Sequence, residues 1–504
     1  MAATGPTIEL KNPLPMVQPG LKFYQHQAEG IPWLIRRDSW LLADDMGLGK
    51  TIQTQVALAW MHNKGLIKRV LVICPPSLKD NWFEETEQKT KFVPVVVPAT
   101  TPKRRTRIIE DFDNGGGDIL IVNFEQVIAH FDQLMALRFD AVVVDECHLV
   151  KNRKSKRTKA VLALTNGIQH RCLLTGSPIL NNVDDLWTLL HMIDPQGAPS
   201  YWTYRNRYVK LSSFKLDRMD PKTGKMRKVT INTVVGVKNE AELHQKLKLV
   251  MLRREKSECM DLPDKHEIVY RVSMSDEQRK VYDEALAGII NVPGEPDPME
   301  VESAIVQFGI LKAICGTTLA VSDQFGDHSG KLDRAVELAI EMFENGKSFV
   351  AFTQHRPVLA AWAARLAKAG FTDNSFQLHG HVKQGDRQAV VRDWTTLVES
   401  GTPSVLSCMY QIGGVGFNMT ACSTVMQIDK LFVPKLNDQA IDRVHRIGVD
   451  LTRPVDVISF VTKDSIESRI EEINRNKRKV FGMVVDGMSE AEYKRRLVKA
   501  VMTT

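Results

Sequence analysis

Five short apolar runs in the first half of the chain constrain its fold more than any other feature. Each run is continuously apolar and ends in a polar or small-residue turn: SWLLADD, RVLVICPPS, GDILIVNFE, FDAVVVDECH and HRCLLTGSP. Continuous rather than alternating apolarity is typical of strands that are buried on both faces. Helical patterns such as TIQTQVALAWMH lie between the runs. Repeated strand, turn and helix predict an α/β fold with a parallel, doubly wound sheet.

The same pattern begins again after residue 330. The second set of runs comprises KSFVAFTQH, SFQLHGH, PSVLSCMYQ, TVMQIDK and PVDVISFVT. We therefore expect two α/β lobes, in keeping with a length of 504 residues, which exceeds one ordinary core. Ligands bind at the carboxyl ends of parallel strands. Two lobes whose polar turns face each other would leave a cleft between them.

These patterns divide the chain into five predicted segments. They are an N-terminal lead (1–19), a first lobe (20–250), an inter-lobe linker (251–270), a second lobe (271–487) and a tail (488–504). The first lobe has an irregular excursion at about 195–245, for which we predict a hairpin at Lys222–Lys228. The second lobe begins with a helical excursion at about 275–325, broken by NVPGEPDP.

Charge and cysteine usage limit the partners and the compartment. A net charge of +7 and a pI of about 8.9 permit nucleic acid as a partner without requiring it. The seven cysteines form no C-x-x-C pair, so neither a zinc site nor a disulfide framework is expected. No run of 18 apolar residues occurs, so no membrane span is predicted. We expect a reducing, internal compartment.

A glycine-containing segment follows the first apolar run and opens a helical pattern. The segment is ADDMGLGKT, residues 43–51. Glycines let backbone N–H groups approach phosphate oxygens, and a helix N-terminus adds partial positive charge. Lys50 is predicted to reach the β- and γ-phosphates of a nucleotide, and the Thr51 hydroxyl to bind Mg²⁺. Asp44 stands where the strict pattern has its first glycine, so a glycine turn that only caps a helix is the alternative.

Two adjacent carboxylates end the run AVVVDECH, residues 141–148. Asp145 is suited to hold Mg²⁺, and Glu146 is suited to polarise an attacking water. The strand lies far enough beyond Lys50 in the sequence for both to belong to one sheet. The alternative is a buried strand that ends in solvated acids.

Two arginines lie close together in LNDQAIDRVHRIG, residues 436–448. Arg443 and Arg446 are three positions apart, and Gln439 precedes Arg443 by four, so a helix would place all three on one face. Gly448 is expected to end that helix. Two close arginines repel each other, so we expect an anion between them. A γ-phosphate held by the first lobe fits, with hydrolysis dependent on lobe closure. A surface helix whose arginines pair with neighbouring aspartates is the alternative.

At these residues the sequence resembles the SNF-type ATPases of helicase superfamily two, over about residues 20–487 and with the motifs in the expected order. The segments that carry the resemblance include FYQHQAEGIPWL, LLADDMGLGKTIQ, LVICPPSLKDNW, DECHLVKN, LTGSPILNNVDDLWTLL, VMLRREKSECMDLPDK, SCMYQIGGVGFNMTACSTVMQID and QAIDRVHRIG. The resemblance implies two RecA-like lobes, a C-terminal brace helix at about 464–487, and ATP with Mg²⁺ as cofactors.

The resemblance also implies a set of site residues. The expected catalytic residues are Lys50, Asp145, Glu146, Arg443 and Arg446, and the expected metal ligands are Thr51 and Asp145. The expected nucleotide-binding residues are Gln25, as the reader of adenine, with Asp45, Met46, Gly47, Leu48, Gly49, Lys50, Thr51, Gly414 and Gln439.

Basic segments suggest a track for nucleic acid. KNRKSKRTK, residues 151–159, carries six basic residues in nine and could follow a phosphate backbone, although a solvated helix face explains such a run equally well. SYWTYRNRYVK interleaves aromatic and basic residues as single-strand stacking platforms do, but we expect core packing there. The basic run and the family resemblance together suggest these contacts: Ser77, Lys151, Arg153, Lys154, Thr175, Gly176 and Gln354.

The function that follows is an ATP-driven motor, a monomer, that moves along duplex or branched DNA through backbone contacts without sequence preference. One alternative is a helicase that separates strands of DNA or RNA. Another is an ATP-gated DNA-binding scaffold without useful turnover, although the presence of Lys50, Glu146 and both arginines argues against it. The expected location is the cytoplasm or nucleoid in a prokaryotic or viral setting, and the nucleus in a eukaryotic one.

Overall fold

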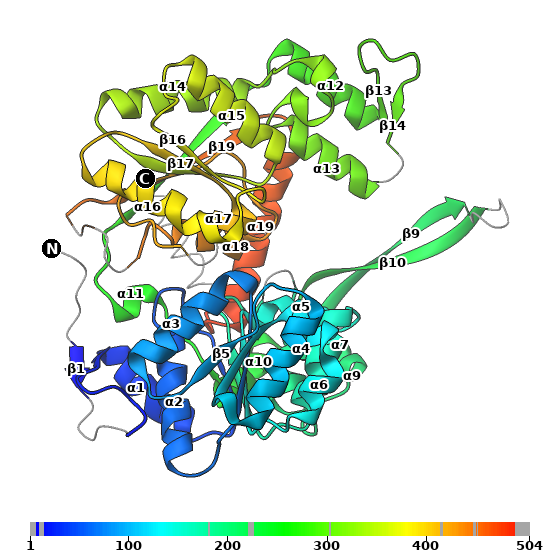
Figure 1. Ribbon diagram of the computed structural model, residues 1–504. Coiled ribbons are helices and arrows are strands. Elements are labelled where there is room, and N and C mark those ends of the chain that lie inside the picture. Colours follow the sequence, from blue (N-terminus) through cyan, green and yellow to red (C-terminus); the bar gives the residue numbers. More distant parts are fainter. Residues whose placement is uncertain are drawn as a thin grey trace. The chain divides into compact units, whose positions relative to one another are not determined.

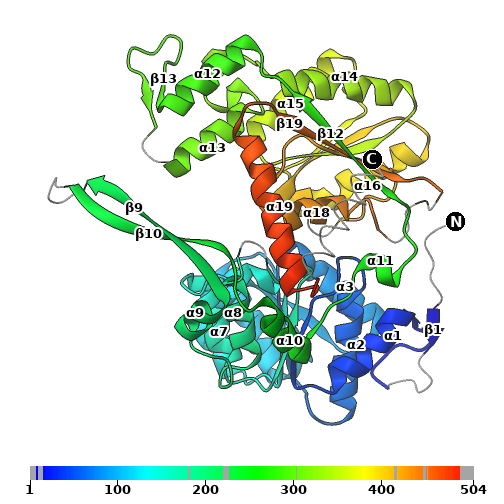
Figure 2. The same ribbon diagram turned by 180° about the vertical axis from the view of Figure 1, so that it is seen from behind.

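The computed structural model describes residues 7–9, 15–179, 182–219, 226–301, 304–413, 417–446, 450 and 452–488. It divides into two compact units (Figures 1 and 2). The first lobe comprises Pro6–Cys259 together with Lys477–Leu497, and the second lobe is centred on Met260–Asn476. Each lobe is described separately.

A seven-stranded parallel sheet forms the centre of the first lobe. Its strand order is β11 (Met251–Leu252), β3 (Ser39–Leu42), β8 (His170–Leu174), β7 (Ala141–Asp145), β4 (Val70–Cys74), β6 (Ile119–Asn123) and β5 (Pro94–Val96). All five apolar runs of the first half therefore form strands, as predicted. The edge strands β5 and β11 were not predicted, because they are only two or three residues long.

Helices cover both faces of this sheet. The helices of the first lobe are α1 (Gln25–Ile35), α2 (Lys50–Asn63), α3 (Lys79–Lys89), α4 (Pro102–Asp111), α5 (Phe124–Ala129), α6 (Phe131–Ala136), α7 (Lys156–Thr165), α8 (Asp185–Ile193), α9 (Tyr201–Tyr208), α10 (Glu240–Val250) and α11 (Lys256–Cys259). Successive strand residues enter two different hydrophobic cores: Val142 and Val144 pack with α5, α7 and α8, whereas Ala141 and Val143 pack with α1, α2 and α3. Burial on both faces explains the continuous apolarity of the strands.

A long β-ribbon flanks the segment for which the sequence predicted a hairpin. β9 (Val209–Met219) and β10 (Met226–Val237) pair with each other in antiparallel register, and residues 222–225 of the predicted hairpin at Lys222–Lys228 lie outside the described residues. Both views show the ribbon projecting from the body of the first lobe (Figures 1 and 2). A separate short pair, β1 (Thr7–Glu9) and β2 (Lys22–Tyr24), precedes α1.

The second lobe contains a six-stranded parallel sheet. Its strand order is β12 (Lys265–Val272), β19 (Val455–Thr462), β18 (Thr424–Gln427), β15 (Phe349–Thr353), β17 (Val405–Met409) and β16 (Ser375–Leu378). All five predicted runs form strands here too. β12 was not predicted as a strand, because most of its residues are exposed at the edge of the sheet and form no apolar run.

The remaining elements of the second lobe are mainly helical. They are α12 (Asp276–Ala287), β13 (Ile289–Ile290), β14 (Met299–Glu300), α13 (Ala304–Ile314), α14 (Gly330–Glu344), α15 (Arg356–Lys368), α16 (Arg387–Glu399), α17 (Tyr410–Gly413), α18 (Pro434–Ile441) and α19 (Ile466–Val484). The predicted break at NVPGEPDP forms the β13–β14 hairpin. Among the described helices, none combines the length and the apolarity that a membrane crossing requires.

The predicted linker and brace both contribute to the lobes themselves. The start of the linker, β11, pairs with β3 of the first lobe, and its last part enters β12 of the second lobe. The C-terminal helix α19 belongs to the second lobe up to Asn476 and to the first lobe from Lys477 onward. Phe481, Val484 and Val485 are buried in one core of the first lobe.

Candidate nucleotide-binding and catalytic site

The phosphate loop lies between β3 and α2, at the carboxyl end of the first sheet. Gly47 and Gly49 have positive φ angles of 86° and 71°, which a residue with a side chain rarely adopts. Gly49 is also the N-cap of α2, so Lys50 is the first residue of the helix. This geometry presents backbone N–H groups and a helix N-terminus to an anion, as the sequence predicted.

The Lys50 amine lies against the loop that precedes it. Its Nζ donates hydrogen bonds to the backbone oxygens of Asp44 at 2.9 Å and Asp45 at 3.3 Å. Burial lowers the pKa of Lys50, and the nearby carboxylates of Glu146, Asp44, Asp145 and Asp45 act in the opposite direction. Lys50, Asp145 and Glu146 therefore share one electrostatic environment, although Asp145 and Glu146 lie almost a hundred residues further along the chain.

Asp145 is the last residue of strand β7 and Glu146 follows it; only β8 separates β7 from β3 in the sheet. Asp145 accepts hydrogen bonds from Trp82 Nε1 at 2.9 Å and from the Glu146 backbone at 2.8 Å. Burial, followed by the Glu146 charge, raises the pKa of Asp145 to about 6. Glu146 has a φ of 49°, which is uncommon for a residue with a side chain and is often found at functional sites.

His148 joins these carboxylates to the segment after β8. Its Nδ1 lies 3.1 Å from Glu146 Oε2 and 2.9 Å from Thr175 Oγ1. Gly176 follows Thr175 and approaches the phosphate loop so closely that a Cβ there would lie 3.0 Å from Met46 Cγ. The buried Thr175 and Gly176 thus connect the carboxylates with the loop.

The structure explains why Asp44 can replace the first glycine of the phosphate loop. The Asp44 carboxylate is completely buried and accepts two hydrogen bonds from the guanidinium of Arg254, with Nε at 3.1 Å from Oδ1. Gln53 Nε2 donates to the same carboxylate at 3.2 Å. The Arg254 guanidinium also donates to the backbone oxygen of His26. Asp44 is therefore a structural anchor between the loop, α1 and the segment after β11.

Two glutamines at the start of α1 differ in their contacts with the phosphate loop. Gln25 is exposed, and its amide donates to Glu29 at 2.9 Å. Gln27 is the buried glutamine: its Nε2 donates to the Leu48 oxygen at 3.3 Å and lies where a Cβ on Gly49 would be. Because α1 begins at Gln25, residues two positions apart point in different directions. Gln25 as the reader of adenine therefore stays a prediction, whereas the glutamine that contacts the loop is Gln27.

The residues of the first lobe that were expected to bind magnesium have side chains that suit this ion. Asp145 and Glu146 are adjacent buried carboxylates. Burial, followed by the Glu146 charge, raises the pKa of Asp145, and a divalent cation would offset both effects. Thr51 lies in the first turn of α2, next to Lys50. Oxygen ligands of this kind suit Mg²⁺ bound together with nucleotide phosphates.

In the second lobe, α18 ends before the two arginines. Gln439 is in the helix and buried, whereas Arg443 and Arg446 lie in the turns that follow Ile441. The expectation of one continuous helical face is therefore wrong. Tighter turns interrupt the helical pattern, since the Arg443 N–H bonds to the Ala440 oxygen and the Arg446 N–H to the Val444 oxygen. Arg443 is 8% exposed.

Two predicted positions of the second lobe fall outside the described residues. They are Gly414, expected in the nucleotide site, and Gly448, expected as the helix C-cap. Gln354 is described and follows β15, where its backbone N–H donates to Asp429 Oδ1 at 3.1 Å.

The predicted nucleic-acid contacts of the first lobe fall into two groups. Thr175 and Gly176 are buried against the catalytic residues, as described above. The partly or fully exposed positions are Ser77 in a 3₁₀ turn before α3 and Lys151, Arg153 and Lys154 between β7 and α7. Lys151 Nζ lies 3.4 Å from Asp185 Oδ2.

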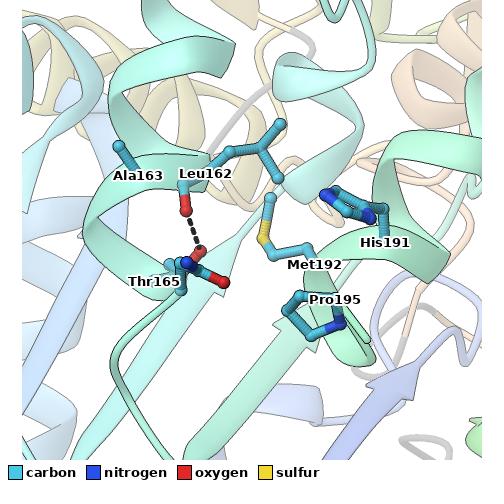
Figure 3. A pocket seen from close by; sticks show the side chains of 7 residues that line it. Leu162, Ala163, Thr165, His191, Met192 and Pro195 are labelled. Atoms are coloured by element: carbon cyan, nitrogen blue, oxygen red, sulfur yellow. Dashed lines mark hydrogen bonds between the residues drawn. The ribbon is translucent and has the colours of Figure 1, made fainter. Parts of the chain in front are cut away.

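A cavity of about 390 Å³ lies elsewhere in the first lobe, between the ends of α7 and α8 (Figure 3). It is lined by Leu162, Ala163, Thr165, Asn166, His191, Met192 and Pro195. Both helices end there, close to the beginning of β8 at His170. This is the amino-end edge of the sheet, opposite the phosphate loop, so the cavity does not belong to the nucleotide site.

Comparison with known proteins places these motifs in a family. A family profile described as SNF2-related domain matches residues 26–316, and one described as helicase conserved C-terminal domain matches residues 330–448. A solved structure described as the Sulfolobus solfataricus SWI2/SNF2 ATPase core in complex with dsDNA is 25% identical, with a TM-score of 0.42, and covers 95% of this chain and 96% of that chain.

Curated relatives come from plants, animals and bacteria. The protein named ATP-dependent DNA helicase DDM1 of Arabidopsis thaliana is 28% identical, covering 95% of this chain and 64% of the relative. The human SWI/SNF-related matrix-associated actin-dependent regulator of chromatin subfamily A member 1 is 26% identical over 91% of this chain and 43% of its own length. An uncharacterized ATP-dependent helicase of Mycoplasma genitalium is 26% identical over 90% of this chain and 41% of its own length. The chain therefore spans less than two thirds of the length of each of these relatives. Because the SNF2-related profile matches more than half of this chain, the chain belongs to the SNF2-related domain family.

Proposed function

We propose that this chain is an ATP-dependent DNA translocase or remodelling motor, which hydrolyses ATP and moves along duplex or branched DNA without sequence specificity. The observation that carries the proposal is the arrangement of Lys50, Asp145 and Glu146 at the carboxyl end of one parallel sheet. A nucleotide-gated scaffold would not require Glu146 beside the metal ligand. Membership of the SNF2-related family and the names of the relatives support the assignment.

Each site residue has a proposed role in hydrolysis. The loop from Asp45 to Thr51 would surround the phosphates, with Lys50 leaving its carbonyl partners to meet the β- and γ-phosphate oxygens. Thr51 and Asp145 would hold Mg²⁺, which would neutralise the phosphate charge. Glu146 would orient the attacking water and accept its proton. Gln27 rather than Gln25 would contact the nucleotide end of the loop.

The arginines of the second lobe would complete the reaction. Hydrolysis increases negative charge around the γ-phosphate, and arginines supplied by another domain can stabilise that charge. We assign this role to Arg443 and Arg446, with Gln439 and Gly414 as further nucleotide contacts. Turnover would then require both lobes, which provides a way to couple hydrolysis to movement.

One observation favours a second candidate, the strand-separating helicase. The β9–β10 ribbon projects from the body of the first lobe, as an element that enters between strands would, although no such element was evident in the sequence. The two candidates differ in substrate, because a translocase follows duplex DNA whereas a helicase follows one strand.

Steady-state ATP hydrolysis tests the proposal. It should be measured at one low salt concentration without nucleic acid and with single-stranded DNA, blunt duplex DNA, branched DNA or RNA, with Lys50→Ala as the background control. Strong stimulation by duplex or branched DNA is expected. Stimulation by single strands or RNA alone would support the helicase instead. We also propose that the chain acts as a monomer where DNA is found, in a nucleoid or a nucleus.

A further inference from the structure

The positive charge of the chain is concentrated in the β9–β10 segment. Residues 209–237 contain seven basic and two acidic side chains, a net charge of +5 where the whole chain has +7. The basic residues are Lys210, Lys215, Arg218, Lys222, Lys225, Arg227 and Lys228, and the acidic ones are Asp217 and Asp220. Concentrated charge of one sign on a small segment is typical of a surface that binds a polyanion.

The backbone of the ribbon suits an extended nucleic-acid partner. β9 and β10 pair only with each other within the described sheets, over 11 and 12 residues, so each strand is roughly 35–40 Å long. At its base, Val209 is buried and Val237 packs against a core of the first lobe. A two-stranded ribbon is narrow enough to enter a DNA major groove. The ribbon therefore has the dimensions to follow a bound duplex.

An aromatic and arginine cluster lies where the ribbon begins. α9 ends at Tyr208, and β9 begins at the next residue. Tyr204 and Tyr208 are buried in the first lobe and fix α9, whereas Trp202 is 60% exposed. The guanidinium of Arg153 lies 3.9 Å from the centre of the Tyr201 ring and 5.7 Å from that of Trp202.

This cluster is positively charged and accessible. Arg153 forms no ion pair within the described part of the chain, whereas Arg205, which also lies over both rings, is 3.5 Å from Asp184. The exposed indole of Trp202 lies beside the guanidinium groups of both arginines. Aromatic rings beside cationic groups are typical of sites where an unpaired base stacks next to its phosphate.

We propose that the β9–β10 ribbon and the Arg153–Tyr201–Trp202 cluster at its base bind branched DNA, with the ribbon on duplex phosphates and Trp202 stacked on an unpaired base. This inference rests on the proposed function, because it takes DNA as the track. It goes further by assigning the preference for a junction to a defined surface outside the ATP site. Such a surface would direct the motor to DNA that contains both duplex and unpaired bases.

Charge removal tests the ribbon. The variant Lys215→Ala/Arg218→Ala/Arg227→Ala is compared with Lys103→Ala/Arg104→Ala/Arg107→Ala, which removes equal charge from exposed positions of α4. Binding of a fluorescent forked DNA is measured between 50 and 200 mM salt. The ribbon variant should reduce the slope of log affinity against log salt by roughly 2–3, whereas the α4 variant should leave it unchanged. Equal slopes for the ribbon variant and the unmodified chain would overturn the ribbon's role.

Substitution of the tryptophan tests stacking. Trp202→Ala should weaken binding to forked DNA by roughly five- to a hundredfold and leave blunt-duplex binding nearly unchanged, because stacking contributes about 1–3 kcal/mol per base. Trp202→Phe should recover much of the loss, and Leu249→Ala, at an apolar residue of α10 that is 70% exposed, should have no effect. Equal losses on both DNAs, or none, would overturn the stacking assignment and leave the cluster to a protein partner or a second copy.

The proposed function can be separated from this inference. ATP hydrolysis without DNA should be unchanged in all these variants, since none of the substituted residues belongs to the nucleotide site. If no nucleic acid stimulates the unmodified chain, the proposed function fails. If DNA stimulates it and the ribbon and Trp202 variants respond normally to forked DNA, only the further inference fails.

Discussion

Arg253 donates a 2.6 Å hydrogen bond from Nη1 to Asp45 Oδ1 of the phosphate loop. The same guanidinium lies 3.2 Å from Asp486 through Nε and covers the ring of Phe481 at 5.5 Å. Although burial lowers the pKa of Arg253, the carboxylates of Asp45 and Asp486 raise it above its usual value. Arg253 thus connects the phosphate loop with the end of the C-terminal helix, two segments more than four hundred residues apart.

This connection predicts that Asp486 acts on nucleotide binding without contacting the nucleotide. Asp486→Asn removes one of the two carboxylates that hold Arg253, so the loop should be less well ordered. We expect the KM for ATP to rise roughly tenfold while kcat changes little, because a hydrogen bond to a charged group contributes about 1.5–3 kcal/mol. Steady-state kinetics measures both constants.

A matched control removes a carboxylate of the first lobe that is remote from the loop. Asp113→Asn breaks the surface pair with Arg69, in which Asp113 is 55% exposed, and should alter neither constant. Asp486→Glu should restore most of the affinity. An unchanged KM in Asp486→Asn would show that the connection does not reach the nucleotide.

Lys50→Ala should abolish productive nucleotide binding. The lysine is the only cation that we place at the phosphates from within the loop, and its loss removes a positive charge that lies close to Glu146 and Asp145. Titration with a fluorescent ATP analogue should show at least a roughly hundredfold loss of affinity, since a charge-assisted contact is strong in a partly buried site. Lys79→Ala controls for the loss of a buried lysine, because Lys79 donates to the Val97 oxygen in the same lobe. Normal hydrolysis in Lys50→Ala would refute the phosphate-loop assignment.

Glu146→Gln should bind ATP and DNA normally but hydrolyse ATP slowly. The amide keeps the size of the side chain but cannot accept a proton from water, and general-base groups contribute about 10²- to 10⁴-fold to rates. Single-turnover hydrolysis and equilibrium binding separate the two effects. Rapid turnover in this variant would exclude Glu146 as the base.

Prediction from the sequence was most successful where local chemistry decides the structure. All ten apolar runs form strands, because burial on both faces requires continuous apolarity. The sequence also placed Lys50 and the Asp145–Glu146 pair on one sheet. Long-range partners were beyond its reach: the Asp44–Arg254 ion pair joins residues 210 positions apart.

The errors have local causes as well. The loop contact of Gln27 was not predicted, because the first residue of α1 decides which glutamine faces the loop, and helix starts are difficult to locate from a single sequence. The arginine segment was expected to be helical because its spacing fits a helix, but tighter turns begin after Ile441. The length of the β9–β10 ribbon was missed because its mixed polar composition lacks a clear alternation.

Arg446→Ala should reduce hydrolysis far more than ATP binding. If the arginine meets charge that develops only in the transition state, kcat should fall by roughly 10³- to 10⁵-fold while the ATP dissociation constant stays within a few-fold. Arg453→Ala is the control, because this arginine of the same lobe is 75% exposed and pairs with Asp450 at the surface. Equal losses of affinity and rate in Arg446→Ala would instead make Arg446 a ligand of the bound nucleotide.

The last prediction concerns His26, which ties α1 to the phosphate loop. Its Nε2 donates to the Leu48 oxygen at 3.0 Å, and its Nδ1 is buried without a hydrogen-bond partner among the described residues. Burial lowers the pKa of His26 below 6.5; the hydrogen bond to Leu48 opposes this shift, and the Arg254 charge adds to it. The unfolded chain therefore binds this proton at a higher pH than the folded chain does, so stability is lost as the pH falls below about 6.5.

His26→Gln keeps an amide donor for Leu48 and removes the titration. Urea unfolding between pH 7.5 and pH 5 should show the unmodified chain losing stability relative to His26→Gln, by at most about 1.4 kcal/mol per pH unit for one proton. The two curves should run parallel above pH 7, where the imidazole is neutral in both states. Parallel curves down to pH 5 would mean that His26 accepts a proton without cost, and that its contact with the loop tolerates a charge.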